Sequence, residues 1–198
     1  GLPNLTLAAT APAFGSSVTM IGNGLTGDAT QVYWSVNNNG NTLGDINGTP
    51  WSWPSLPDAS GANASGYNWG SGSAMRWGSN TITGSTTNNS TSLLYSTFDA
   101  NPGFSPISGE AQGATGDSGG GVFYKNGATW ELAGIMAYVG SYNNQPGSTA
   151  VFENVTEFAN IAVYQAAILS AIPEPANLAA WGGAAAVGFA FWRRRRRA

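Results

Sequence analysis

The sequence predicts an all-β domain that ends in one helix. Seven short segments are rich in β-branched and aromatic residues and are bounded by Gly, Asn or Pro, which is typical of a barrel or a sandwich. These segments are 16–24, 30–36, 79–84, 92–98, 120–124, 129–139 and 149–155. Residues 155–171 place apolar side chains at helical spacing, which predicts the helix. Its apolar positions include Phe158, Ile161, Ala162, Tyr164 and Ile168.

Two features are expected between the strands. The segments 120–124 and 129–139 form a hairpin, because Asn126-Gly127 supplies the positive φ angles that a tight turn favours. Residues 37–73 have no sustained period and many turn-forming residues, so they are interpreted as one long surface insertion. The aromatic side chains of this insertion either bind sugar or substrate or pin the loop to the domain. They are Trp51, Trp53, Tyr67 and Trp69.

Charge is scarce and unevenly distributed. Only 9% of the 198 residues are charged, and the chain has neither cysteine nor histidine. Before the tail, Arg76 and Lys125 are the only cations, whereas all ten acidic residues except Glu174 precede Pro173. No nucleic-acid partner is expected, because a protein that binds the phosphate backbone needs a basic face. The absence of cysteine excludes disulfides and thiolate metal sites, and neither a metal nor a cofactor is expected.

The C-terminal tail predicts a membrane-spanning helix. Residues 176–192 are uncharged, and 17 residues span about 26 Å as a helix, close to the thickness of the hydrocarbon core. The run that follows would stay in the cytoplasm by the positive-inside rule. A buried core helix is the alternative, but it rarely ends in five consecutive arginines. The basic run is Arg193, Arg194, Arg195, Arg196 and Arg197.

Pro173, Glu174 and Pro175 directly precede this helix. The order of Pro-Glu-Pro, apolar helix and arginine cluster resembles the PEP-CTERM sorting signal of Gram-negative bacteria, over residues 172–198. The resemblance implies export, transient anchoring in the inner membrane and cleavage by an exosortase-type enzyme near Pro-Glu-Pro. The final location would then be the cell surface or the medium. No signal peptide opens the chain, so we expect that its N-terminus was removed or that it is a fragment.

Residues 116–120 read Gly-Asp-Ser-Gly-Gly and are followed by an apolar strand, a hairpin and a second apolar strand. The block 110–162 resembles the C-terminal half of chymotrypsin-like (trypsin-like) serine endopeptidases. The resemblance implies that residues 15–171 form the second six-stranded barrel of that fold. It also makes Ser118 the nucleophile, which forms an acyl-enzyme, and assigns the oxyanion hole to the backbone N–H groups of Gly116 and Ser118.

The same resemblance implies further roles. Asp117 would be the carboxylate that pairs with the new amino terminus on zymogen activation. The base of the primary pocket, at Gln112, carries no carboxylate, so small or medium apolar residues are expected before the scissile bond of a peptide or protein substrate. The substrate-binding residues implied are Gln112 at the base, Val139 and Ala150 on the walls, and Ala137, Tyr138 and Val139 on the strand edge that pairs with the substrate.

The sequence departs from the family at some of these positions. The usual Pro is absent after the second Gly of the motif, Ala137 stands for a Ser that often supports the catalytic Asp, and Tyr138 stands for the common Trp. The family order is His, Asp, Ser, so both partners of Ser118 are expected upstream of Gly1. Residues 1–14 would then be the end of the first barrel and the interdomain linker.

These expectations favour the C-terminal portion of an exported serine endopeptidase. Two alternatives remain. A non-catalytic, protease-like binding or matrix module anchored at the cell envelope would tolerate the loss of histidine. A purely structural exported protein would carry the Ser118 motif by chance.

Overall fold

The computed structural model describes residues 5–38 and 50–171. Two units divide the chain, residues 1–163 and residues 164–198, and every described strand belongs to the first. The expectation of a mostly β chain with one helix near its C-terminal end is confirmed for the described residues. The strands are β1 (Thr6–Leu7), β2 (Ser17–Gly22), β3 (Leu25–Trp34), β4 (Ser55–Leu56), β5 (Ala64–Ser73), β6 (Arg76–Thr81), β7 (Gly84–Asn88), β8 (Thr91–Thr97), β9 (Ala100–Asn101), β10 (Ser105–Pro106), β11 (Gly121–Asn126), β12 (Thr129–Gly140), β13 (Thr149–Val151) and β14 (Val155–Asn160), and the helix is α1 (Ile161–Ala171).

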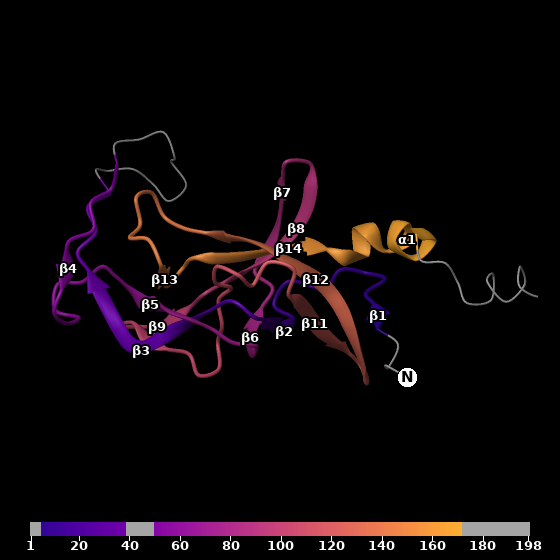
Figure 1. Ribbon diagram of the computed structural model, residues 1–198, viewed down its shortest axis with the longest axis horizontal. Coiled ribbons are helices and arrows are strands. Elements are labelled where there is room, and N and C mark those ends of the chain that lie inside the picture. The colour runs from indigo at the N-terminus through magenta and orange to yellow at the C-terminus, as the bar shows by residue number, and fades with distance from the viewer. Residues whose placement is uncertain (1–4, 39–49, 172–198) are drawn as a thin grey trace, which may run out of the picture. The chain divides into compact units, whose positions relative to one another are not determined.

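The strands of the first unit form two main sheets. The larger sheet has the order β6-β2-β11-β12-β14-β8-β7, with β1 paired in parallel to β12. The smaller has the order β13-β5-β3-β4. In Figure 1 the long strands β3 and β5 lie on the left, whereas the hairpin β11–β12 lies on the right. All seven predicted strand segments overlap a strand of the structure.

The chain that follows β6 lies beside β8. The backbone N–H of Thr83 donates to the C=O of Tyr95 at 2.9 Å, and Asn80 Nδ2 on β6 donates to the C=O of Thr97 at 2.9 Å. These bonds hold β6, at one edge of the large sheet, close to β8, which is next to β7 at the other edge. Buried apolar side chains of the large sheet, with Ile82 directly after β6, form the main core, namely Val18, Met20, Ile82, Leu94, Val122, Met136 and Phe158.

The hairpin predicted at Asn126-Gly127 is present, with a shift of one residue. Asn126 is the last residue of β11 and pairs with Thr129 on β12, so Gly127 and Ala128 form the loop. Gly127 has a φ of 60°, a left-handed conformation that glycine adopts without steric cost. Asn126 is therefore a strand residue rather than a turn residue.

The interpretation of residues 37–73 as one surface insertion is wrong over their last third. Residues 64–73 form β5, which pairs with β3 on one side and with β13 on the other. Gly66 allows this pairing, because a Cβ there would collide with the backbone of Ala150 and Val151. The Gly and Ser residues that indicated turns thus permit close strand contact instead. Residues 39–49 lie outside the described residues.

The helix expected over residues 155–171 begins only at Ile161. Residues 155–160 form β14, which pairs with β12 on one edge and β8 on the other. Burial alternates along β14, and Phe158 is fully buried, as a strand between two neighbours requires. Asn160 ends the strand, and its Oδ1 accepts a hydrogen bond from Ala162 N–H at 3.2 Å, an N-terminal cap for α1.

No helix among the described residues has the length and apolar character needed to cross a membrane. The expected membrane helix 176–192 lies outside the described residues. The same holds for the other parts of the expected sorting signal, which are Pro173, Glu174, Pro175 and the run Arg193–Arg197.

Candidate functional site

The turn that carries Ser118 is fastened to β12 by its backbone. Gly119 N–H donates to the C=O of Met136 at 2.9 Å, and Met136 N–H donates to the C=O of Gly120 at 2.8 Å. Gly119 has a φ of 86°, so the turn uses a conformation that a side chain would strain. Ser118 itself is exposed, and its position relative to β12 is set by hydrogen bonds on its C-terminal side.

Two backbone N–H groups of this turn have no acceptor. Among the described residues, the N–H groups of Gly116 and Ser118 make no hydrogen bond. By contrast, Asp117 N–H donates to the C=O of Ala114 at 3.0 Å, and Gly120 N–H donates to the C=O of Asp117 at 2.9 Å. An oxyanion hole needs donors that are held in place and left unpaired. Gly116 and Ser118, the residues that the sequence indicated, supply two such donors.

Asp117 anchors the turn to β2 and the residues that follow it. Its Oδ1 accepts a hydrogen bond from Gly24 N–H at 2.6 Å, and its Oδ2 accepts one from Ala114 N–H at 2.8 Å. A Cβ at Gly22 or at Gly24 would collide with the Asp117 carboxylate, so both glycines make room for it. The partners of Asp117 are thus backbone amides, whereas the sequence had indicated a new amino terminus. The Gly-x-Gly spacing at 22–24 was the signal for this contact that the sequence interpretation missed.

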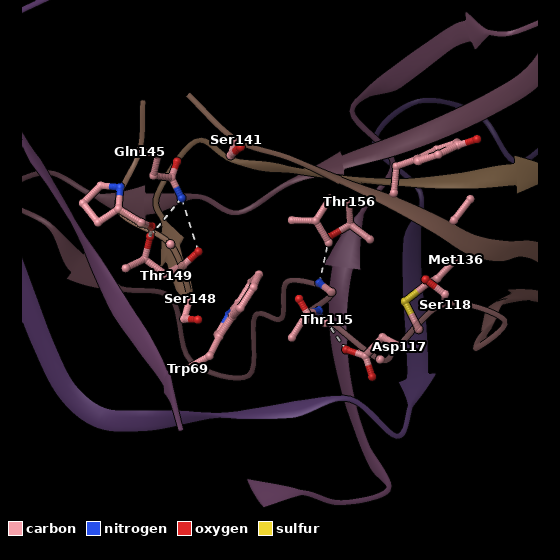
Figure 2. Close-up of a pocket in the computed structure, with 18 residues that line it drawn as sticks. Trp69, Thr115, Asp117, Ser118, Met136, Ser141, Gln145, Ser148, Thr149 and Thr156 are labelled. Carbon is pink, nitrogen blue, oxygen red and sulfur yellow. Dashed lines mark hydrogen bonds between the residues drawn. The ribbon is translucent and has the colours of Figure 1, made fainter. Parts of the chain in front are cut away.

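A cavity of about 400 Å³ lies beside Ser118. Residues 113–118 line one side of it, together with Ala137, Tyr138 and Val139, which the sequence had indicated. Figure 2 shows Ser118 and Met136 on one side of this cavity and Trp69, Gln145 and Thr149 on the other. Trp69 comes from β5, the strand that the sequence interpretation had treated as a loop.

Gln112 and Ala150, the other two predicted pocket residues, do not line this cavity. Gln112 lines a separate cavity of about 180 Å³, where both polar atoms of its side-chain amide are buried and have no partner in the described part of the chain. Ala150 packs in a second core cluster with Phe98 and Phe152. The neighbours of these two residues, Gly113 and Thr149, line the cavity in their place.

A long-range hydrogen bond joins two residues of this cavity. Gly113 N–H donates to Thr156 Oγ1 on β14 at 2.8 Å, and both residues line the cavity. On β13 the two faces of the strand alternate, so Thr149 and Ala150 point in opposite directions. A shift of one residue along an extended segment therefore exchanges a cavity residue for a core residue.

The wall opposite Ser118 is polar, uncharged and held by its own hydrogen bonds. Gln145 Nε2 donates to Thr149 Oγ1 at 3.1 Å and to Asn154 Oδ1 at 2.9 Å, and Asn154 Nδ2 donates back to Gln145 Oε1 at 2.9 Å. Thr149 Oγ1 donates to the C=O of Pro146 at 2.6 Å. Apart from Asp117, whose oxygens are occupied by amides, no charged residue lines the cavity in the described chain. The cavity is therefore suited to an uncharged group, and its wall offers hydroxyl and amide groups rather than only apolar ones.

The described residues supply no base for Ser118. The chain has no histidine, and Ser118 Oγ makes no hydrogen bond within the described residues. The same residues contain no group of three or more His, Cys, Asp or Glu side chains that could hold a metal ion. The site thus consists of a hydroxyl, two unpaired amides and a shaped cavity.

The chain matches no protein-family model, no curated protein and no solved structure. A functional proposal therefore depends on the geometry of the Ser118 turn and on the sequence motifs.

Proposed function

We propose that the chain is the C-terminal portion of an exported chymotrypsin-like (trypsin-like) serine endopeptidase, which hydrolyses peptide bonds through an acyl-enzyme on Ser118. One observation carries the proposal. An exposed serine lines a cavity of about 400 Å³ and lies in the same turn as two backbone N–H groups that have no acceptor among the described residues. Acyl transfer needs a nucleophile, oxyanion donors and a substrate pocket close together, so this arrangement supports the proposal.

The strand order supports the second barrel of the chymotrypsin-like fold as the architecture. Six strands follow one another in the order β6-β2-β11-β12-β14-β8, and the chain after β6 is hydrogen-bonded to β8. Such an arrangement allows a six-stranded sheet to close on itself. The Ser118 turn would lie directly before β11, at one end of this sheet.

In the proposed mechanism, a histidine from a polypeptide outside residues 1–198 accepts the proton of Ser118 Oγ as the oxygen attacks the substrate carbonyl. The carbonyl oxygen becomes an oxyanion and accepts hydrogen bonds from Gly116 and Ser118 N–H. The imidazolium then protonates the leaving amine as the peptide C–N bond breaks. Water, deprotonated by the same histidine, attacks the ester carbonyl, and the proton returns to Ser118 Oγ.

The edge of β12 beyond the hairpin supports the binding of an extended substrate. Strand β11 pairs with β12 only as far as Ile135, whereas β14 pairs with the opposite edge as far as Gly140. Among the described strands, none pairs with residues 137–140 on the side of β11. A substrate backbone added at this edge would run past Ser118, in the manner of strand addition.

The tail supports the proposed location. Pro-Glu-Pro at 173–175, the apolar run 176–192 and Arg193–Arg197 have the order of a PEP-CTERM sorting signal. We propose export, transient anchoring in the inner membrane of a Gram-negative bacterium and processing by an exosortase-type enzyme. The product would reach the cell surface or the medium.

A non-catalytic binding or matrix module is the second candidate, and the lack of histidine favours it. Labelling with a fluorophosphonate probe separates the two candidates. Residues 1–198 alone should not label, because an oxyanion hole does not replace a missing base. Expressed with any polypeptide encoded in frame before Gly1, the protein should label and cleave peptides, and Ser118→Ala should abolish both activities.

Two results would contradict the enzyme proposal. An in-frame start directly before Gly1 would remove the expected source of the base and favour the binding module. Strong labelling of the histidine-free chain would show that a group other than an upstream histidine activates Ser118.

A further inference from the structure

A second cavity, of about 490 Å³, shares no lining residue with the cavity beside Ser118. Its walls come from the chain on either side of β4, from residues 100–104 and from residues 142, 152 and 153. Five aromatic residues and one carboxylate, that of Glu153, belong to the lining. The aromatic residues are Trp51, Trp53, Phe104, Tyr142 and Phe152.

Three of these rings form a continuous cluster around Tyr142. The ring of Trp51 stacks on Tyr142 with 5.8 Å between centroids and 21° between planes, and the ring of Trp53 lies 5.9 Å from Tyr142 at 31°. Two hydrogen bonds hold the cluster. Trp53 Nε1 donates to the C=O of Asn143 at 3.0 Å, and Asn144 Nδ2 donates to the C=O of Trp51 at 2.9 Å. The rings are thus arranged before any ligand binds, which lowers the entropic cost of binding.

No described residue provides a counter-ion for the carboxylate of Glu153. Among the described residues its oxygens make no hydrogen bond or ion pair, and neither Arg76 nor Lys125 lines the cavity. Burial and the negative charge of Asp99 raise the pKa of Glu153. Burial and the charge of Glu153 together raise the pKa of Tyr142 to about 12. No described protein group neutralises the Glu153 carboxylate, and a cation bound beside it would favour its ionised form.

Two lining residues adopt backbone conformations that are costly for side chains. Phe104 has a φ of 61° and Glu153 a φ of 71°. Both are held in place, since Gln31 Nε2 donates to the C=O of Phe104 at 2.8 Å and Glu153 N–H donates to the C=O of Phe98 at 2.7 Å. Backbone strain of this kind is common at ligand-binding sites, where the surrounding structure holds the residue in its unfavourable conformation.

We propose that this cavity binds a basic side chain of a polypeptide, a Lys ammonium or an Arg guanidinium, against the rings of Trp53 and Tyr142, with Glu153 as its counter-ion. A cation gains from the electron-rich faces of Trp and Tyr and from the unpaired carboxylate at the same time. A neutral sugar would stack on the rings but would leave the charge of Glu153 uncompensated.

Two further observations favour a polypeptide as the source of the cation. The indole N–H of Trp51 is buried and has no acceptor in the described chain, and a backbone carbonyl of a bound segment is a suitable acceptor. Nine carboxylates against two cations before residue 173 attract basic segments at long range. The proposal does not depend on the chemistry of Ser118.

Binding of a Lys-containing tripeptide to the full 198-residue chain in neutral detergent tests the proposal, with tryptophan fluorescence as the readout. The control probe carries norleucine, which lacks the ammonium group, in place of lysine. The lysine probe should bind, more weakly at high salt, and the norleucine probe should not. Glu153→Gln should weaken binding at least about tenfold, the scale of a lost charged hydrogen-bond partner.

Matched variants test whether the probe binds in this cavity or elsewhere on the protein. Trp53→Ala should abolish binding, whereas Trp130→Ala, an exposed indole outside the cavity, should not change it. Serine in place of Arg193–Arg197 removes the chain's own basic run as a competitor. Three results would overturn the proposal. The first is equal affinity for the lysine and norleucine probes, and the second is a neutral oligosaccharide that displaces the lysine probe. The third is that neither the unmodified protein nor the variant with serine in place of Arg193–Arg197 binds the lysine probe. Circular dichroism verifies that each variant keeps its fold.

Discussion

Asp117 Oδ1 accepts a hydrogen bond from Gly24 N–H at 2.6 Å, although 93 residues separate the two in the sequence. This bond joins the turn of Ser118 to the segment that follows β2. The position of this turn thus depends on a distant residue, because the lack of a side chain at Gly24 leaves room for the Asp117 carboxylate.

Gly24→Ala should therefore displace the Ser118 turn. A Cβ at residue 24 would lie 2.8 Å from Asp117 Cγ and from Asp117 N, which is too close for any real contact. We expect a loss of about 1–3 kcal/mol in the free energy of unfolding, measured by urea denaturation. Gly72→Ala is the control, because its Cβ would meet nothing closer than 3.9 Å. Equal free energies of unfolding for the two variants would show that the close approach of Asp117 to Gly24 does not contribute to stability.

The stability of the protein should depend on the ionisation of Glu110. Burial raises the pKa of Glu110, the charges of Asp99 and Glu153 add to this, and the bond from Asp99 N–H to Oε1 at 2.8 Å opposes it. A raised pKa in the folded state means that the protonated form stabilises the fold. This stabilisation is complete below the unfolded pKa and is lost as the pH rises through the folded pKa.

Glu110→Gln removes this ionisation. Between about pH 4 and pH 7, its free energy of unfolding should fall less with rising pH than that of the unmodified protein. Ser108 and Glu110 both line a cavity of about 190 Å³, and Ser108→Ala, which removes a neutral hydroxyl from it, should keep the original pH dependence. Parallel curves for Glu110→Gln and the unmodified protein would contradict the prediction.

The cavity beside Ser118 should disfavour basic side chains in the proposed enzyme. In a peptide library cleaved by the catalytically complete protein, Lys and Arg should be rare before the scissile bond. Among the described residues, Asp117 supplies the one carboxylate of the lining, and its oxygens already accept bonds from two backbone N–H groups. Ser148→Asp should reverse this preference. Ser148 lines the cavity, is exposed and has a φ of 58°, which Asp tolerates.

The expected rise in relative kcat/KM for Lys and Arg substrates is roughly tenfold or more, the scale of a charged hydrogen bond. Ser148→Asn is the matched neutral control and should leave the preference unchanged. A library profile of the unmodified protein dominated by Arg or Lys would show that this cavity does not select the residue before the scissile bond.

The tail should control membrane attachment. Deletion of residues 173–198 should release the protein from the membrane fraction, because it removes the apolar run 176–192. Replacement of Arg193–Arg197 by serine should disturb orientation more than attachment, since those charges set the orientation. Fractionation after a high-salt wash measures the first effect and protease accessibility the second. Retention of the deleted form in washed membranes would place the anchor elsewhere.

Local sequence patterns predicted much of the fold. Each of the seven predicted strand segments overlaps a strand, because β-branched and aromatic residues bounded by turn formers suit a pleated, half-buried surface. The Gly116-to-Gly120 motif likewise indicated a turn with free amides. Such a turn is a short-range structure, and its conformation depends mostly on its own glycines.

Two strands were not predicted from local sequence patterns, because they depend on pairing with strands that are distant in the sequence. Residues 64–73 are rich in Gly and Ser and form a strand only because β3 and β13 pair with both of its edges. Residues 155–160 carry apolar side chains that suit a helix as well as a strand. Their position between β12 and β8 decides in favour of the strand.

The sequence by itself determined the β-rich class, the hairpin at Gly127 and the turn of Ser118, because these depend on residues that are neighbours in the chain. Only the tertiary structure decided which member of each adjacent pair faces the cavity, Gly113 rather than Gln112 and Thr149 rather than Ala150. It also brought Gly24 to Asp117 and Trp69 to the cavity of Ser118. The physical reason is that successive strand residues face opposite sides, while contacts such as that of Gly113 with Thr156 join residues that are 43 apart in the sequence.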